Sequence, residues 1–548
     1  MSVNAPHADR AVKDGGPGSA SNGGASESPL SASYRQGQLI KMAGFFGFLV
    51  GVVAFMYDYA MELSLRVVWE VIPGALERQA EQQGNMDSLN RWGFLYTLAA
   101  SITLATGAGV CIKYLGFPGD LPNVIHCVHT LGYVPMKQTL PMIAVSLLSI
   151  AAGGSLGPEA PLVAVSASLS GWLSMNYFKH DMVMVQRCTI IGMSAGLSAF
   201  FGVQLGGGLF ALEVLNTMGM QFFEVAVYSI GAGGVCLAVY RGLQGQAFGE
   251  IWAFTPIPQS TATEVFLGAI IGVLAGVVGI VFRSMFRRVG KGVKVMGLGN
   301  FDDTRSPVIL AALGGLCVSV IGVLVPPTMF WSEFEIASIA EPGKPLPHIW
   351  PPGGVFYGLE RYPWETGPMY MLVGVAKLLA IACTVQAGLR GGFIFPLFFA
   401  GASIGRGLFV YSEEFLPDGL VNASPALLCM CFAAGLNVAV TRTPFASPLI
   451  LVTLSGQPNI SAPAICASLA SLFITRSSKF IGPQRDRDDL KFVGDVRPLE
   501  PPAMPAVAAK DGEPAGAVET GALLGASGVN GTYDAIVGGV KEVAALTV

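Results

Sequence analysis

Residues 154–161 read Gly-Ser-Leu-Gly-Pro-Glu-Ala-Pro and interrupt sequence that is apolar enough to lie in a membrane. Apolar residues 140–152 precede this break, and apolar residues 162–173 follow it. Non-helical backbone survives at membrane depth only where protein buries it or where it lines a water-filled cavity. A carboxylate at that depth is a functional-site hypothesis by default. The stretch therefore predicts a membrane protein with broken helices and a functional site at Glu159.

We interpret the break as the start of a new helix. Proline is favoured just inside a helix start, because the N–H that it lacks would have no partner there. The free amides and positive dipole end of such a helix would form an anion site, with Glu159 poised over it. The alternative is one kinked helix in which a protonated Glu159 bonds to a neighbour. A second break, Gly-Leu-Arg-Gly-Gly-Phe-Ile-Phe-Pro at 388–396, favours the first interpretation.

The composition indicates a polytopic membrane protein. Of the 548 residues, 52% are hydrophobic and only 12% are charged, whereas ordinary globular domains carry about 25% charged residues. The net charge of −4 argues against a nucleic-acid partner. Nine cysteines are scattered through the chain and predict no metal site.

Fourteen apolar runs have lengths that suit membrane helices. Several are too short to span upright, and short broken segments at matching places in two halves are typical of inverted-repeat transporters with a midplane site. We therefore predict an all-α polytopic membrane protein with two inverted-topology repeats of broken and tilted helices. The predicted helices are 39–60, 91–112, 138–152, 160–174, 183–200, 205–218, 222–240, 264–286, 307–326, 369–386, 393–411, 424–440, 444–457 and 460–475.

The chain is expected to contain one membrane domain between two tails. Basic residues precede the first helix, follow the first helix of the second half and follow the last helix. If all three groups lie in the cytoplasm, the first helix of each half crosses the membrane in the opposite direction. Too few residues follow 491 for a regulatory domain pair. The expected divisions are a disordered tail 1–34, a membrane domain 35–491 (repeat one 35–242, repeat two 262–460, final pore helix 460–482) and a low-complexity tail 492–548.

Residues 157–161 resemble the Gly-Arg-Glu-Gly-Pro motif of the CLC chloride channel/transporter family. Residues 391–396 resemble the Gly-x-Phe-x-Pro motif of the same family, and the similarity spans about residues 36–491. This resemblance implies a homodimer with one anion pathway per subunit, in which helix N-termini and main-chain amides hold the anion and no cofactor is needed. It also implies that Glu159 is a gate, which enters the anion site when ionised and leaves it when protonated.

The resemblance further implies a set of anion-binding residues. The serine of the family's Gly-Ser-Gly-Ile-Pro motif aligns with Gly119, or with Pro118 after a one-residue insertion, and the pore tyrosine aligns with Phe480. Both side-chain hydroxyl donors are therefore missing, which predicts weaker and less discriminating binding. Nearby Asp120 would either cap helix 121–131 or affect the ions. The implied residues are Pro118, Gly119, Gly157, Ala160, Phe393, Ile394 and Phe480.

Two alignments of residues 201–214 leave the coupling open. In one alignment Glu213 matches the first acid of a family pair, and Val214 replaces the second acid, which relays protons in exchangers. A one-residue slip makes Glu213 the relay and a candidate for the proton path. We favour a passive anion channel; the alternative is a proton-coupled exchanger of chloride, nitrate or fluoride.

Other classes of function fit the sequence poorly. An intramembrane enzyme would need a motif such as His-Glu-x-x-His, which does not occur, or a Gly-x-Ser-x-Gly elbow with a partnered histidine, which we do not identify. His126 and His129 have no third metal ligand nearby in sequence. A cation transporter would want several carboxylates in mid-membrane, where only Glu159 and Glu213 qualify. The expected partners are a small inorganic anion, the lipid bilayer and a second copy of the chain.

Overall fold

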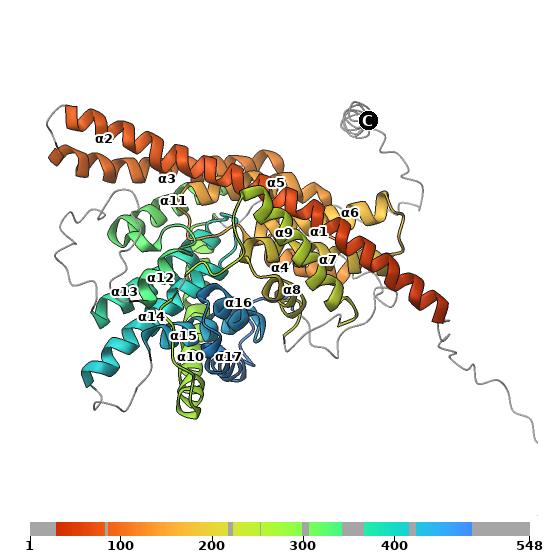
Figure 1. Ribbon diagram of the computed structural model, residues 1–548. Coiled ribbons are helices and arrows are strands. Elements are labelled where there is room, and N and C mark those ends of the chain that lie inside the picture. The colour runs from red at the N-terminus through yellow and green to blue at the C-terminus, as the bar shows by residue number, and fades with distance from the viewer. Residues whose placement is uncertain are drawn as a thin grey trace, which may run out of the picture. The chain divides into compact units, whose positions relative to one another are not determined.

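The computed structural model describes residues 29–82, 86–217, 223–252, 254–298, 306–341, 366–415 and 424–484, and these are almost entirely helical (Figure 1). The tail 492–548 and most of the tail 1–34 lie outside the described residues. The helices of the first half are α1 (Pro29–Arg66), α2 (Ile72–Gln82), α3 (Met86–Leu115), α4 (Leu121–Thr130), α5 (Thr139–Ala151), α6 (Glu159–Asn176), α7 (Met182–Phe201), α8 (Gln204–Glu213) and α9 (Ala226–Gln244). Those of the second half are α10 (Ala262–Val295), α11 (Ser306–Leu324), α12 (Glu335–Ala340), α13 (Gly367–Gln386), α14 (Ile394–Phe415), α15 (Pro425–Thr441), α16 (Ala446–Ser455) and α17 (Ser461–Ile474).

Every predicted apolar run forms a helix, but several boundaries differ: α8 ends at Glu213 rather than 218, α10 continues to Val295 rather than 286, and the bounds of α1 and α17 differ as well. Helix α1 begins at Pro29, earlier than the expected start of order at 35, since proline is tolerated in the first turn. Beyond residue 60, α1 continues through a π-helical turn (Val67–Val71) into α2, which is amphipathic and so escaped a search for apolar runs. Helix α17 ends at Ile474 rather than near 482, and a turn follows in which the Ser478 amide donates to the Thr475 carbonyl.

The helix packing repeats itself between the two halves. Helix α6 packs on α7 as α14 packs on α15, and α7 packs on α9 as α15 packs on α17. In the same way, α1 packs on α9 and α7 as α10 packs on α17 and α15. Helix α17 thus occupies in the second half the place that α9 occupies in the first.

One pair of backbone hydrogen bonds shows how the halves are related. The Gly157 amide donates to the Gly392 carbonyl at 2.7 Å, and the Gly392 amide donates to the Gly157 carbonyl at 2.6 Å. This antiparallel bridge joins the corresponding breaks of the two halves. Equivalent segments that run antiparallel and exchange equivalent bonds are related by a local two-fold axis, as the prediction of inverted repeats requires.

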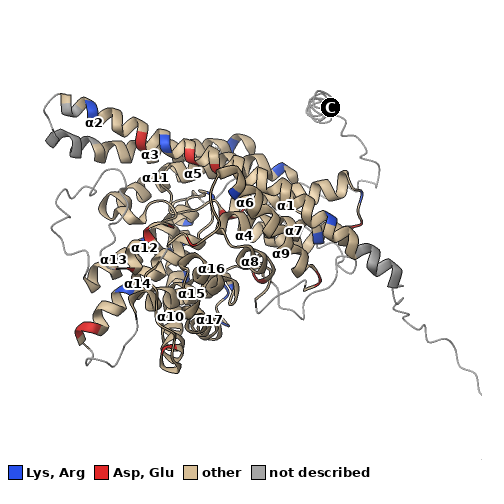
Figure 2. Ribbon diagram, in the orientation of Figure 1, with Lys and Arg blue, Asp and Glu red and all other residues tan. Residues whose placement is uncertain are grey.

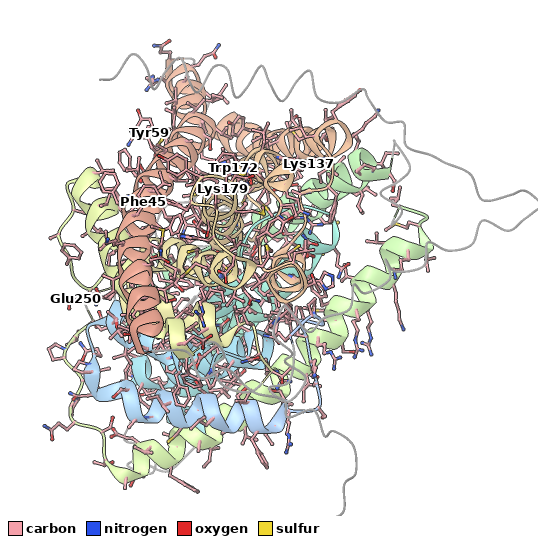
Figure 3. The ribbon with its side chains drawn as sticks, turned by 90° about the vertical axis from the view of Figure 1, so that its right-hand side faces the viewer. Phe45, Tyr59, Lys137, Trp172, Lys179 and Glu250 are labelled. Carbon is pink, nitrogen blue, oxygen red and sulfur yellow. The ribbon has the colours of Figure 1, made fainter. Side chains whose placement is uncertain are left out.

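The helix surfaces are those of an integral, multi-pass membrane protein. Within the described part of the chain, eight helical segments are long and apolar enough to cross a membrane. Charged side chains are few and lie mainly near helix ends (Figure 2). Large apolar side chains such as Phe45 and Tyr59 on α1 are exposed (Figure 3). In α7 and α14, by contrast, 83% of the most apolar 18-residue segment is buried, so these two helices lie in the interior of the subunit.

Candidate functional site

Two helix starts meet at the centre of the described chain. Helix α5 ends at Ala151, residues 152–158 are not helical, and a new helix begins at Glu159. Gly153 ends the first helix with a left-handed backbone (φ 78°), a conformation that suits glycine. In the second half, α14 begins at Ile394, two residues after the bridge residue Gly392. The alternative of one kinked helix through residues 154–161 is therefore wrong.

The Glu159 carboxylate occupies the space between the two breaks. The side chain is 1% exposed, and its Oε1 accepts a hydrogen bond from the Phe395 amide at 3.1 Å. The carboxylate thus sits at the positive end of α14, where it makes a charge-assisted bond. A Cβ atom built on Gly157 or Gly392 would collide with the other carboxylate oxygen, Oε2. Both positions must be glycine for Glu159 to lie where it does.

The donor differs slightly from the predicted amides near Ala160, Phe393 and Ile394. Because α14 begins at Ile394, Phe395 is its second residue, and an acceptor at a helix start ordinarily bonds the second or third free amide. A more exact estimate of the helix start would have identified it.

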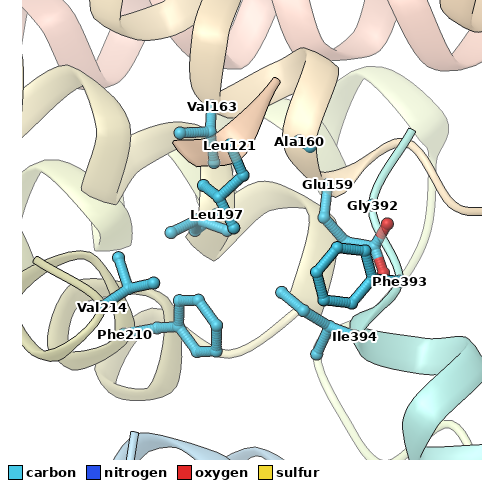
Figure 4. A pocket seen from close by; sticks show the side chains of 10 residues that line it. All are labelled: Leu121, Glu159, Ala160, Val163, Leu197, Phe210, Val214, Gly392, Phe393 and Ile394. Atoms are coloured by element: carbon cyan, nitrogen blue, oxygen red, sulfur yellow. The ribbon is translucent and has the colours of Figure 1, made fainter. Parts of the chain in front are cut away.

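A small cavity adjoins the carboxylate and measures about 10 Å³, the least volume that holds a water molecule. Glu159 lies on one side of it beside Gly392 and Phe393, and Phe210 and Val214 lie across from it (Figure 4). With Glu159 in this position there is no room for an anion. The lining residues are Leu121, Glu159, Ala160, Val163, Leu197, Phe210, Val214, Gly392, Phe393 and Ile394.

A second cavity of about 130 Å³ shares Leu121, Ala160 and Phe393 with the first. Phe480 lines it, with its ring 6.2 Å from that of Phe393 and stacked on a third phenylalanine, Phe282. The predicted residues Ala160, Phe393 and Phe480 are thus brought together around two adjacent cavities.

The start of α4 borders the second cavity. The Asp120 side chain accepts from the Asn123 amide at 2.9 Å, so the capping role predicted for Asp120 is confirmed. Pro118 and Gly119 precede this cap and are buried, but neither lines the cavity. Their part in anion binding stays a prediction.

Glu213 faces away from both cavities. It is fully buried at the end of α8, and its carboxylate accepts from the Phe445 amide and, at 2.9 Å, from the Ala446 amide. These amides begin α16, so Glu213 caps that helix from another element. The neighbouring residue that lines the Glu159 cavity is Val214.

Lys377 is a buried cation that the sequence analysis did not consider. From α13, its ammonium donates to the carbonyls of Thr328, Met329 and Phe330 and to the Ser332 hydroxyl, at 2.7–3.2 Å. The Phe330 amide in turn donates to the Gly153 carbonyl at the end of α5. Lys377 thus braces the loop that supports the break before Glu159. A charge in mid-membrane was the available signal.

The two histidines do not form a metal site. His129 Nε2 lies 2.9 Å from the Leu215 carbonyl, which indicates a packing role. Over the described ranges no group of three or more His, Cys, Asp or Glu side chains is placed to hold a metal ion.

Comparisons with known proteins identify relatives over most of the chain. A family model described as voltage gated chloride channel matches residues 107–476. The ClcB-like candidate chloride channel protein of Ralstonia nicotianae is 26% identical over 347 residues, which are 62% of this chain and 72% of that protein. The candidate ion-transport protein YfeO of Escherichia fergusonii is 24% identical over 422 residues, 75% of this chain and 87% of that protein.

Solved structures share the fold at low sequence identity. A slow cyanobacterial Cl⁻/H⁺ antiporter has a TM-score of 0.64 and 16% identity, with 81% of this chain and 96% of that one covered. A CLC-type fluoride/proton antiporter has a TM-score of 0.57 and 17% identity, with 83% and 99% covered. These likenesses confirm the predicted all-helical fold class.

Proposed function

Because the chain belongs to the CLC family of chloride channels and transporters, whose members are anion transport proteins and not enzymes, we propose that it is a passive anion channel gated by Glu159. One observation supports the proposed gate: the Glu159 carboxylate accepts the hydrogen bond of the Phe395 amide at the start of α14. An anion that is to use this amide must displace the carboxylate. Protonation weakens the carboxyl as an acceptor and removes its charge, so it frees the site.

The residues around the gate support a channel over an exchanger. Of the ten residues that line the Glu159 cavity, Glu159 alone is titratable, and the residue after Glu213 that lines this cavity is the apolar Val214. Glu213, the acid nearest in sequence, makes its described hydrogen bonds to the start of α16. A proton that leaves Glu159 has no second acid on the cavity wall to receive it.

The exchanger remains the second candidate. Two structurally similar proteins are described as Cl⁻/H⁺ and fluoride/proton antiporters. Glu213 is a buried carboxylate, and the next residue, Val214, lies in the cavity wall. A rotation of α8 by one residue would bring Glu213 to the position of Val214 in that wall.

Flux through reconstituted protein distinguishes the two candidates. Purified protein in liposomes with an outward chloride gradient should release chloride, and an external pH electrode should record no proton uptake beyond that of empty vesicles. Proton movement in fixed proportion to chloride would contradict the channel and support the exchanger. A series of chloride, nitrate, bromide and fluoride in the same assay identifies the preferred anion.

We further propose that the protein is a homodimer with a separate pathway in each subunit, as the family resemblance implies. Each subunit would then conduct by itself.

A further inference from the structure

Arg390 lies in the wall of the larger cavity, and neither the sequence motifs nor the proposed gate accounts for it. It occupies the loop between α13 and α14, two residues before the bridge glycine Gly392. The cavity of about 130 Å³ is next to the Glu159 cavity, with which it shares part of its wall. Its lining residues are Asp120, Leu121, Pro122, Met142, Ala160, Phe286, Val385, Leu389, Arg390, Gly391, Phe393, Phe480 and Ile481.

The Arg390 guanidinium is a buried charge without a counter-charge of its own. The residue is 7% exposed, and its backbone amide is fixed by the Ser149 hydroxyl at 3.1 Å. Its Nε has no hydrogen-bond partner in the described part of the chain. The guanidinium carbon lies 4.3 Å from the centre of the Phe117 ring, which stabilises a cation but supplies no acceptor. A buried and unpaired charge destabilises the folded protein unless an ion of opposite sign joins it.

The negative charge of Asp120 partly offsets the positive charge of Arg390. Its carboxylate interacts electrostatically with Arg390, yet no ion pair between the two side chains is formed in the described structure. The Asp120 carboxylate instead accepts from the Asn123 amide as the cap of α4. An anion beside Arg390 would thus be attracted by the guanidinium and repelled by one carboxylate, a balance that permits binding without a trap.

We propose that Arg390 is a specificity-determining residue that makes this cavity a binding site for a small planar oxyanion, such as nitrate, in preference to a halide. A guanidinium offers a planar fork of N–H groups that matches two oxygens of an oxyanion, whereas a spherical halide cannot accept both bonds along their preferred directions. This assignment rests on the proposed function, because the site lies in series with the Glu159 gate. It also compensates for the missing hydroxyl donors, since Phe480 in the same wall has none.

Equilibrium binding and flux of the full-length protein test the assignment with four proteins: wild type, Arg390→Lys, Arg390→Gln and Asp120→Asn. Wild type should bind and carry nitrate in preference to chloride. Arg390→Lys keeps the charge and loses the fork, so the nitrate preference should fall by roughly tenfold while chloride binding is retained. Arg390→Gln should weaken the binding of both anions. Asp120→Asn keeps a good helix cap and removes the repulsion, so both anions should bind more tightly with their ratio unchanged.

The outcomes separate this inference from the proposed function. Wild type that carries no anion at all would overturn the proposed function. If wild type carries anions, but Arg390→Lys and Arg390→Gln have the same nitrate-to-chloride ratio as wild type, only the role of Arg390 is overturned. If the Arg390 variants do not elute as a single species on gel filtration, Asp120→Asn decides: unchanged affinity for both anions contradicts a charged site here.

Discussion

At the scale of single residues, the site depends on the absence of two side chains. Gly157 and Gly392 pair their backbones, and the Glu159 carboxylate fills the space where a Cβ at either position would lie. The carboxylate then reaches the Phe395 amide and leaves a cavity of about 10 Å³. Under the proposed function, the closed state of the pathway is a contact between one acid and one amide.

Glu159→Gln should remove the pH dependence of anion flux. In wild type, flux should rise as the pH falls, because protonation neutralises the carboxylate that competes for the Phe395 amide. Glutamine is neutral at every pH, so its flux should match that of acidified wild type throughout. Anion flux from liposomes between acidic and alkaline pH measures this. Equal pH profiles for the two proteins would mean that Glu159 has only a structural role.

Gly392→Ala should open the gate at neutral pH. The added methyl group collides with the Glu159 carboxylate, which must then leave the Phe395 amide. Flux at neutral pH should rise towards that of Glu159→Gln. Gly231→Ala in α9 is the matched control, because its methyl group meets nothing within 4 Å. A Gly392→Ala protein with wild-type flux and wild-type pH dependence would contradict this account.

At the scale of helices, two buried charged side chains bind backbone groups at a helix start and in a loop. Glu213 binds the first amides of α16, and Lys377 binds the carbonyls of residues 328–330. Neither group lines either of the two cavities described above. Both act by satisfying backbone groups that an interrupted helix or a buried loop leaves without partners.

Glu213→Ala should destabilise the start of α16. It leaves two buried amides, those of Phe445 and Ala446, without an acceptor, at a cost of about 1–3 kcal/mol. Glu213→Gln should cost less, because an amide oxygen still accepts. Thermal unfolding in detergent compares the variants. Under the channel proposal, Glu213→Gln should also leave the pH dependence of flux unchanged; if it abolishes coupled proton movement, Glu213 is a relay.

Lys377→Met should be strongly destabilising. It removes the ammonium donor from three carbonyls and one hydroxyl, of which the Met329 carbonyl keeps a bond from the Ser332 hydroxyl, and one unsatisfied buried group alone costs about 1–3 kcal/mol. Lys113→Met is the control, since Lys113 is exposed at the end of α3. Thermal unfolding in detergent should show a large fall for Lys377→Met only. Similar unfolding temperatures for the two variants would show that the loop is held by other contacts.

At the scale of the whole molecule, the two halves of the membrane domain form a duplicated helical unit around the Glu159 site. Its two halves repeat the same packing and meet at the antiparallel glycine bridge. Exposed apolar residues cover the outer helices, and they can face lipid or a second subunit equally well.

The mass of the purified protein tests the proposed dimer. After the contribution of detergent is subtracted, light scattering should give twice the chain mass of 57.2 kDa. Dilution should not change this value, because a large apolar interface in a membrane protein dissociates slowly. The dimer would be contradicted if the purified protein had the mass of one chain and still carried anions in liposomes at very low protein density.

The sequence by itself determined the membrane helices, the two breaks and the acid at the first of them. These features are local, because a run of apolar residues sets a bilayer-spanning helix and Gly or Pro ends it. The tertiary structure decided which amide Glu159 holds, since Phe395 lies 236 positions away. It also decided that Val214 rather than Glu213 lines the Glu159 cavity and that Arg390 lies in the wall of the larger cavity beside it. Such choices depend on how each helix is rotated against distant neighbours, and a residue's own sequence neighbourhood does not contain that information.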